Sequence, residues 1–430
     1  MPSTPEPHDA RAHSGAPRQP WPQRPAAGVA VAFALIAYPA LLLLVRGAVN
    51  AALILLALLS VAMLTALPAA TMAPAERNRV RAWVAAMLGV SMATLLSQSV
   101  HGSWVWRHDD APARFVLAIP VYFALRRVDQ RRLAALQYGL IAGALLIAVG
   151  LVVAPHRDPF GRISTGFIDL ITFGNMALLI GVLAALSIGW LGPEPRWRHA
   201  LKLAALLAGI CASVVSGSRG GWVALPLFLG IGLAGRAHRG DLRRVAWITT
   251  GALALAALGY WLVPEIHERA GLVLSNMQAF ERGDLNTSVG IRLQLWRVAL
   301  HLWVQHPWFG VGPGGFKAAM TPMQQAGWLT PLAAQFGRGE VHNEILDKTC
   351  ALGVPGLVAI VALYLVPAAI FARRLRGDAA VPARMGLALS LGFLVYGLTV
   401  ETFDLTMNAA FYALSSAVLL AATLRPAHES

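Results

Sequence analysis

Three short polar stretches of the chain carry side chains suited to binding an anion or moving a proton. The first stretch, SGSRGG at 216–221, places Arg219 between two apolar runs. Glycines let a backbone approach a ligand closely, and a guanidinium and a helix N-terminus both favour phosphate. A tight turn whose arginine reaches for water explains the same residues equally well. Arg219 and Ser218 are therefore candidate site residues with a structural alternative.

The second stretch begins at Ser288 and contains Arg292, with Trp296 four residues later. Because Arg292 and Trp296 are one helical turn apart, we expect them to share a face of a helix over 290–305. A fixed guanidinium on that face suits a phosphate, and the alternative is an amphipathic helix with a solvated arginine. A turn rich in glycine and proline, PWFGVGPGGF, follows at 307–316.

The third stretch, RGEVHNE at 338–344, lies directly before an apolar run. Its His342 has an ordinary pKa of about 6.5, so the imidazole can act as a neutral base at neutral pH. A lone histidine in such a place is more often structural than catalytic. Arg338 is a further candidate phosphate ligand, and Asn343 is expected to orient the imidazole or contact substrate.

The carboxylates near these stretches each have two explanations. Glu340 and Glu344 either steer a base or face water, and we expect Asp347 to face water. Glu401 and Asp404 lie between the last two apolar runs, where we expect them to cap or solvate a turn.

Two more arginines, Arg157 and Arg162, lie in a short segment at 155–166. They either meet phosphate groups of a substrate or form a charged loop tip. The chain has no Asp-x-Asp pair, and its adjacent Asp109 and Asp110 point different ways. We therefore expect no metal and no cofactor.

Composition identifies the class of protein. Of the 430 residues, 57% are hydrophobic and 13% are charged, whereas globular proteins carry about 25% charged residues. Most of the surface must therefore face lipid, and soluble classes are excluded. In a membrane protein the net charge of +14 indicates cytoplasmic loops and anionic lipid or phosphate partners rather than nucleic acid.

About twelve runs are long and apolar enough to cross a bilayer, which needs about 20 residues per helix. We place them at 27–46, 49–70, 82–98, 113–125, 133–154, 167–191, 200–216, 219–235, 245–263, 351–371, 384–400 and 405–424. The runs are continuously apolar, without the alternation of a barrel strand, so they predict helices. With twelve alternating crossings, 22 of the 35 Lys and Arg residues fall on one side, in short clusters beside helix ends. By the positive-inside rule this side is cytoplasmic and holds both termini.

The expected organisation is an all-α integral membrane protein with a helical loop domain between the ninth and tenth spans. A disordered cytoplasmic arm at 1–26 precedes helices 1–9 at 27–263. The loop domain at 264–350 lies outside the cytoplasm, helices 10–12 follow at 351–424, and residues 425–430 form a cytoplasmic tail.

The motifs of the three stretches together resemble the O-antigen ligase and polymerase superfamily. The resemblance rests on SGSRGG at 216, S-x-G-x-R-x-x-x-W at 288, PWFGVGPGGF at 307, and H-N followed after nine residues by G-x-x-G from 342 to 356. Their order and the large loop before the last helices also match. The close resemblance covers about 210–360, and the rest of the chain matches in topology.

The resemblance implies a metal-independent glycosyltransferase of the GT-C class in the bacterial inner membrane, with its active site facing the periplasm. An O-antigen ligase moves a glycan from undecaprenyl diphosphate to a sugar hydroxyl of lipid A-core and so completes lipopolysaccharide. The resemblance gives His342 the role of general base and Arg219 and Arg292 the role of diphosphate ligands. The expected donor, undecaprenyl-diphosphate-linked O-antigen, and the acceptor are both anchored in lipid.

Three alternatives stay open at this point. An O-antigen polymerase and an O-linked protein oligosaccharyltransferase belong to the same superfamily and differ in acceptor. A secondary transporter is the alternative from another class, because twelve helices are common in transporters. Transport usually needs ionisable groups at the bilayer midplane or inverted repeats, whereas the predicted spans place almost all ionisable residues at helix ends and show no repeat.

Overall fold

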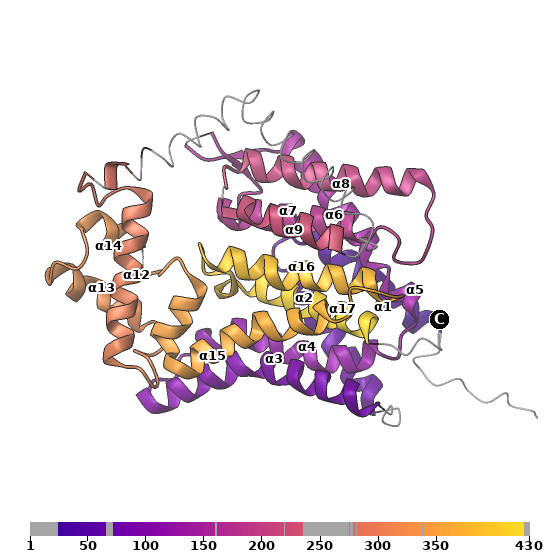
Figure 1. The fold of residues 1–430 in the computed structure, drawn as a ribbon, viewed down its shortest axis with the longest axis horizontal. Coiled ribbons are helices and arrows are strands. Elements are labelled where there is room, and N and C mark those ends of the chain that lie inside the picture. The colour runs from indigo at the N-terminus through magenta and orange to yellow at the C-terminus, as the bar shows by residue number, and fades with distance from the viewer. Residues whose placement is uncertain are drawn as a thin grey trace, which may run out of the picture.

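The computed structural model is a bundle of long helices with a smaller helical layer at one end (Figure 1). The structure describes residues 25–65, 72–159, 161–218, 220–234, 275, 278–280, 282–337 and 339–424. These residues contain fifteen α-helices, two short 3-10 helices and one two-stranded antiparallel hairpin. The expected all-α fold class is confirmed for this part of the chain.

Eleven helices make up the bundle, and each overlaps one of the predicted apolar runs. They are α1 (Pro25–Leu41), α2 (Ala48–Thr65), α3 (Pro74–His101), α4 (Arg107–Leu125), α6 (Leu136–Val153), α7 (Leu170–Leu186), α8 (Arg196–Val215), α9 (Leu225–Ala234), α15 (Glu344–Ala372), α16 (Ala380–Gly397) and α17 (Thr406–Thr423). The run predicted at 245–263, most of the predicted arm and the tail lie outside the described residues.

Short elements connect these helices. They are α5 (Gln130–Leu133), β1 (His156–Arg157), β2 (Ile163–Ser164), η2 (Gly220–Ala224) and η3 (Thr402–Asp404).

Seven segments of the described chain are helical, long and apolar enough to cross a membrane. They are α2, α3, the joined segment Gln130–Val153, α8, α15, α16 and α17. The apolar helices Gly28–Leu41, Leu170–Leu186 and Gly220–Ala234 are shorter. The chain is thus a membrane protein with several candidate spans, and the number twelve stays a prediction.

The long bundle helices lie side by side and run between two ends of the bundle (Figure 1). The end of α3 lies against the small helical layer, where His101 is close to Gly312, and α15 starts at the same end. We call this the site end. The opposite, far end receives basic clusters that begin α3, follow α4, begin α8 and follow α15.

The small layer at the site end consists of α12 (Ser288–Gln305), α13 (Gly315–Gln325) and α14 (Pro331–Gly337). The helix predicted over 290–305 is confirmed as α12, which starts where the Thr287 side chain accepts a hydrogen bond from the Gly290 N–H. Apolar residues of the three helices form a second core with buried Val341 and Cys350. This core ties the layer to the first turns of α15.

Helix α15 begins at Glu344, seven residues before the predicted run, and is interrupted at Gly353. Gly353 has φ 68° and ψ −153°, a conformation open essentially to glycine alone. A Cβ there would lie 2.5 Å from the backbone of Trp308. The interruption frees backbone groups of α15, and Val311 N–H donates to the Cys350 carbonyl (2.9 Å) while Val354 N–H donates to Pro307 (2.9 Å). The PWFGVG turn and the G-x-x-G pair of α15 are therefore one structural unit.

Candidate functional site

His342 lies at the site end, directly before α15. Its φ of 56° is in the left-handed region, and it is the one non-glycine residue with a positive φ in the described part of the chain. Such a conformation costs an L-residue about 1–2 kcal/mol, so neighbouring groups must hold it. Its side chain is 21% exposed, which leaves the imidazole mostly enclosed but open to a substrate.

The carboxyl group of Glu401 holds this strained backbone from the turn between α16 and α17. Its Oε1 accepts hydrogen bonds from the backbone N–H groups of Val341 and His342, the latter at 3.1 Å. Burial raises the pKa of Glu401 well above its ordinary range, and nearby carboxylates reinforce the effect against the attraction of Lys348. The Glu401 carboxyl group also shares a hydrogen bond with the side chain of Asp404.

The turn that carries Glu401 is itself fixed by packing. The ring of Phe403 lies 5.1 Å from that of Phe115, 5.2 Å from that of Phe393 and 5.1 Å from that of Tyr412, centroid to centroid. Aromatic pairs at such distances stabilise one another beyond the area that they bury. Glu401 is thus presented to His342 from a rigid aromatic core.

Asn343 has a structural role beside its predicted one. Its side-chain Oδ1 accepts a hydrogen bond from the Leu346 N–H (3.1 Å) and caps α15, while Nδ2 lies 3.4 Å from the Leu398 carbonyl. Asn343, which directly follows His342, is therefore attached to the same turn that carries Glu401.

In the structure Arg292 lies close enough to His342 for its charge to act on the imidazole. Burial lowers the pKa of His342, the positive charge of Arg292 lowers it further, and Asp169 opposes them. The imidazole is consequently neutral at neutral pH. Burial also lowers the pKa of Arg292, but an arginine in a protein stays charged. A base that can accept a proton thus lies within electrostatic range of a permanent cation.

The SGSRGG turn at 216–221 packs between α7 and the α16–α17 turn. A Cβ on Gly220 would lie 2.9 Å from Thr399 Oγ1, and one on Gly221 would lie 2.6 Å from Asn175 Oδ1. The two glycines are needed for this close approach. Arg219, predicted as a diphosphate ligand, lies outside the described residues.

Ser218 of this turn is 4% exposed, and its hydroxyl donates to Asn175 Oδ1 (3.1 Å). The Asn175 Nδ2 group is buried without a hydrogen-bond partner among the described residues. Buried polar groups are rarely left unpaired. Asn175 therefore fixes the SGSRGG turn to α7, and the sequence did not single it out because it lies within an apolar run.

Trp296 lies on α12, one turn after Arg292 as predicted, and packs against the second core. Its indole Nε1 is buried with no partner in the described part of the chain. Arg338, the predicted ligand close to His342 in sequence, lies outside the described residues.

Arg157 and Arg162 lie on the β1–β2 hairpin that precedes α7. Arg157 is exposed. Arg162 forms an ion pair with Asp158, with 2.6 Å between Nη2 and Oδ2. The hairpin contacts α7 and α8, so both arginines stay near the site end, and their contact with substrate stays a prediction.

The expectation that Asp347 faces water is wrong. Its side chain is 16% exposed and lies 2.9 Å from the Lys348 Nζ, which also lies 2.6 Å from Asp404 and 3.3 Å from Glu344. These three carboxylates are close enough together to hold a cation, and the ammonium of Lys348 provides one. The sequence could not reveal this cluster because residues 344–348 and 404 come from different helices.

The side chains of Glu344 and Glu401 are also buried instead of solvated. Glu344 is fully buried, and its Oε2 accepts a hydrogen bond from the Phe403 N–H (2.8 Å). Glu401 is 7% exposed and bonded to the backbone before α15. Both carboxyl groups join α15 to the last turn of the site end instead of facing water.

Residues 203–361 match the family described as O-Antigen ligase. This part of the chain is an O-antigen ligase family domain. An uncharacterized protein of Haemophilus influenzae (strain ATCC 51907 / DSM 11121 / KW20 / Rd) is 25% identical over 276 residues, which are 63% of this chain and 67% of that protein. The predicted resemblance to the superfamily is thereby confirmed.

The O-antigen ligase domain contains the SGSRGG turn, Arg292 and His342, but it ends before Thr399 and Glu401. The α16–α17 turn therefore completes the site from outside the matched range. A sequence signal did exist, since an acidic residue between two apolar runs of a membrane protein marks a candidate functional position.

Proposed function

We propose that the protein is an O-antigen ligase, which transfers a glycan from undecaprenyl diphosphate to a sugar hydroxyl of lipid A-core. The observation that carries the proposal is the partly exposed imidazole of His342, whose pKa is lowered by burial and by the positive charge of Arg292. A base and a fixed cation are the two groups that this transfer needs. The O-antigen ligase domain supports a lipid-linked glycan as the donor.

The distribution of charge supports a periplasmic site. The basic clusters beside α3, α4, α8 and α15 lie at the far end of the bundle. Cytoplasmic loops carry an excess of Lys and Arg, so we assign the far end to the cytoplasm. His342 then faces the periplasm of a bacterial inner membrane, where both lipid-anchored substrates are available.

The proposed reaction is a single in-line displacement. The acceptor hydroxyl oxygen attacks C1 of the donor sugar while His342 takes the hydroxyl proton. The bond between C1 and the diphosphate oxygen breaks, and the diphosphate leaves with the electron pair. One displacement inverts the anomeric centre.

Arginines would stabilise the charge that develops on the departing diphosphate. Arg292 is near the base, and Arg219 and Arg338 are proposed to join it. Paired guanidinium hydrogen bonds suit phosphate oxygens and act without a metal. Lysine keeps the charge but not the planar fork of the guanidinium. R292K should therefore transfer glycan from the donor faster than R292A and more slowly than the wild type.

Reconstitution tests the proposal. Purified protein is supplied with an undecaprenyl-diphosphate-linked glycan and rough lipopolysaccharide, and the products are separated by size. A lipopolysaccharide ladder that disappears with H342A is the expected result. Longer lipid-linked glycan in place of the ladder would instead indicate a polymerase, and glycan on an added acceptor protein would indicate an oligosaccharyltransferase.

A further inference from the structure

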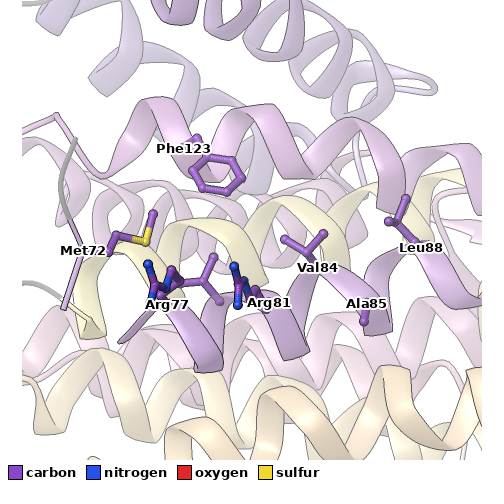
Figure 2. Close-up of a pocket in the computed structure, with 8 residues that line it drawn as sticks. Met72, Arg77, Arg81, Val84, Ala85, Leu88 and Phe123 are labelled. Atoms are coloured by element: carbon purple, nitrogen blue, oxygen red, sulfur yellow. The ribbon is translucent and has the colours of Figure 1, made fainter. Parts of the chain in front are cut away.

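A groove on α3 at the far end of the bundle is unrelated to the candidate site. Its cavity is about 690 Å³ and is lined by Met72, Arg77, Val80, Arg81, Val84, Ala85, Leu88 and Phe123. This volume falls within the range of about 300–1,000 Å³ seen for small-molecule sites. Phe123 comes from the neighbouring helix α4, Met72 lies two residues before α3, and the other residues belong to α3 (Figure 2).

The groove is divided into a charged part and an apolar part. Arg77 and Arg81 are one helical turn apart and lie side by side, while Val84, Ala85 and Leu88 follow along the same helix (Figure 2). At 1.5 Å per residue, Leu88 is about 10 Å farther along the helix axis than Arg81. A ligand that fills the groove must therefore be anionic at one end and apolar along its length.

Both arginines of the groove are available for a ligand. They are exposed, and neither has an ion-pair partner in the described part of the chain, unlike Arg126 nearby, which is paired with Glu76. Two guanidinium forks on one face suit the oxygens of a phosphate.

The position of the groove along α3 matches the depth of a lipid headgroup. Helix α3 has 28 residues and is thus about 42 Å long, whereas the hydrocarbon core of a bilayer is about 30 Å thick. The first turns, with Arg77 and Arg81, can lie at headgroup level while Val84 and Leu88 lie among acyl chains. The basic far end would also attract anionic lipid electrostatically.

We propose that this groove binds an anionic phospholipid of the bilayer, with its phosphate between Arg77 and Arg81 and an acyl chain along Val84 and Leu88 toward Phe123. The site is independent of the glycan transfer proposed above, because it lies at the other end of the bundle. It would hold the protein at a fixed depth and rotation in the membrane.

Native mass spectrometry of the full-length protein tests the proposal with two probes, phosphatidylglycerol and uncharged phosphatidylcholine. Each basic residue near a membrane surface contributes about fivefold to anionic lipid binding, so R77Q/R81Q should weaken phosphatidylglycerol binding by about 30-fold. R79Q removes one charge from the same helix outside the groove lining and should change binding by less than the loss of one groove arginine. R77K/R81K should restore most of the binding.

A second variant separates the groove from general charge attraction. A85W fills the groove without changing its charge and should release phosphatidylglycerol. Equal retention of phosphatidylglycerol by wild type, R77Q/R81Q and A85W would overturn the proposal. So would equally strong binding of phosphatidylcholine, or tighter binding of undecaprenyl phosphate than of phosphatidylglycerol. Detergent-solubilised variants must elute from a size-exclusion column as the wild type does, and A85W provides the test if the glutamine pair does not.

Discussion

Glu401 accepts a hydrogen bond from the backbone N–H of His342, 59 residues earlier in the chain, at 3.1 Å. The same oxygen accepts the N–H of Val341. His342 has the positive φ expected of glycine, and this pair of hydrogen bonds explains how the conformation is held. The contact links the proposed base to a part of the chain beyond the O-antigen ligase domain.

Replacement of Glu401 should show that the protonated carboxyl group, not the carboxylate, holds the backbone at His342. E401Q keeps an acceptor for the two backbone N–H groups and a donor toward Asp404, so it should retain most activity and heat stability. E401A leaves two N–H groups without that acceptor and should lose about 2–6 kcal/mol of stability, at about 1–3 kcal/mol for each. Ladder formation and thermal unfolding measure both variants. A glutamine variant as impaired as the alanine variant would contradict a neutral Glu401.

Because the pKa of Glu401 is raised in the folded protein, the folded state binds a proton that the unfolded state releases at about pH 4.3. The contribution of this group to stability therefore declines as pH rises above that value toward the folded pKa. The decline should be absent in E401Q, which cannot ionise.

Substitution of His342 should remove turnover without removing the fold. A positioned base contributes about 10²- to 10⁴-fold, so H342A and H342G should both lose ligation by that factor. Glycine adopts φ 56° freely, and H342G should therefore be at least as heat-stable as the wild type, whereas H342A keeps the strain. Recovery of activity in H342G would mean that the histidine serves only the backbone.

The acid limb of the pH–rate profile should move in opposite directions in two variants. The proposed transfer requires neutral His342, so kcat/KM should fall as pH drops through a pKa below about 6.5. Arg292 lowers that pKa, and R292Q should shift the limb to higher pH. Asp169 raises it, and D169N should shift the limb to lower pH while asparagine still caps α7. Profiles of kcat/KM that coincide in the three proteins would exclude His342 as the titrating group.

Lys348 should be important for stability rather than for turnover. Its ammonium lies within 3.3 Å of Asp347, Asp404 and Glu344, and K348M leaves these carboxylates without their cation. Breaking a buried ion pair by removing one partner costs about 3–5 kcal/mol, so K348M should unfold at a clearly lower temperature. The combined variant K348M/E344Q should recover part of the loss. Unchanged thermal unfolding of K348M would mean that the carboxylates are neutral in the folded protein.

Gly353 should be intolerant of any side chain. G353A places a Cβ 2.5 Å from the Trp308 backbone and requires alanine to adopt the positive φ of this position. It should therefore prevent assembly of the site. Gly47 is a matched control, because it also has a positive φ (84°) but a Cβ there meets nothing within 4 Å. G47A should therefore lose only the backbone preference, about 1–2 kcal/mol. Similar protein yields and activities for the two variants would contradict the packing unit of α15 and residues 307–312.

The sequence predicted the bundle well because each helix of a membrane protein must be apolar over its own length. All eleven described bundle helices overlap predicted runs, and α12 followed from local periodicity. The juxtaposition of Arg292 and His342 could be inferred only through the family motifs. Contacts between distant turns, such as Lys348 with Asp404 or Glu401 with His342, depend on how α15, α16 and α17 pack, and no local pattern encodes that packing.

The α16–α17 turn touches the SGSRGG turn through Thr399 and the His342 backbone through Glu401. The turn between the last two helices thus contacts both the SGSRGG turn and the segment that carries His342. Chimaeras that exchange acceptor specificity between relatives would need to carry residues 398–404 together with 340–348 from the same parent, since a junction between them separates the imidazole from its support.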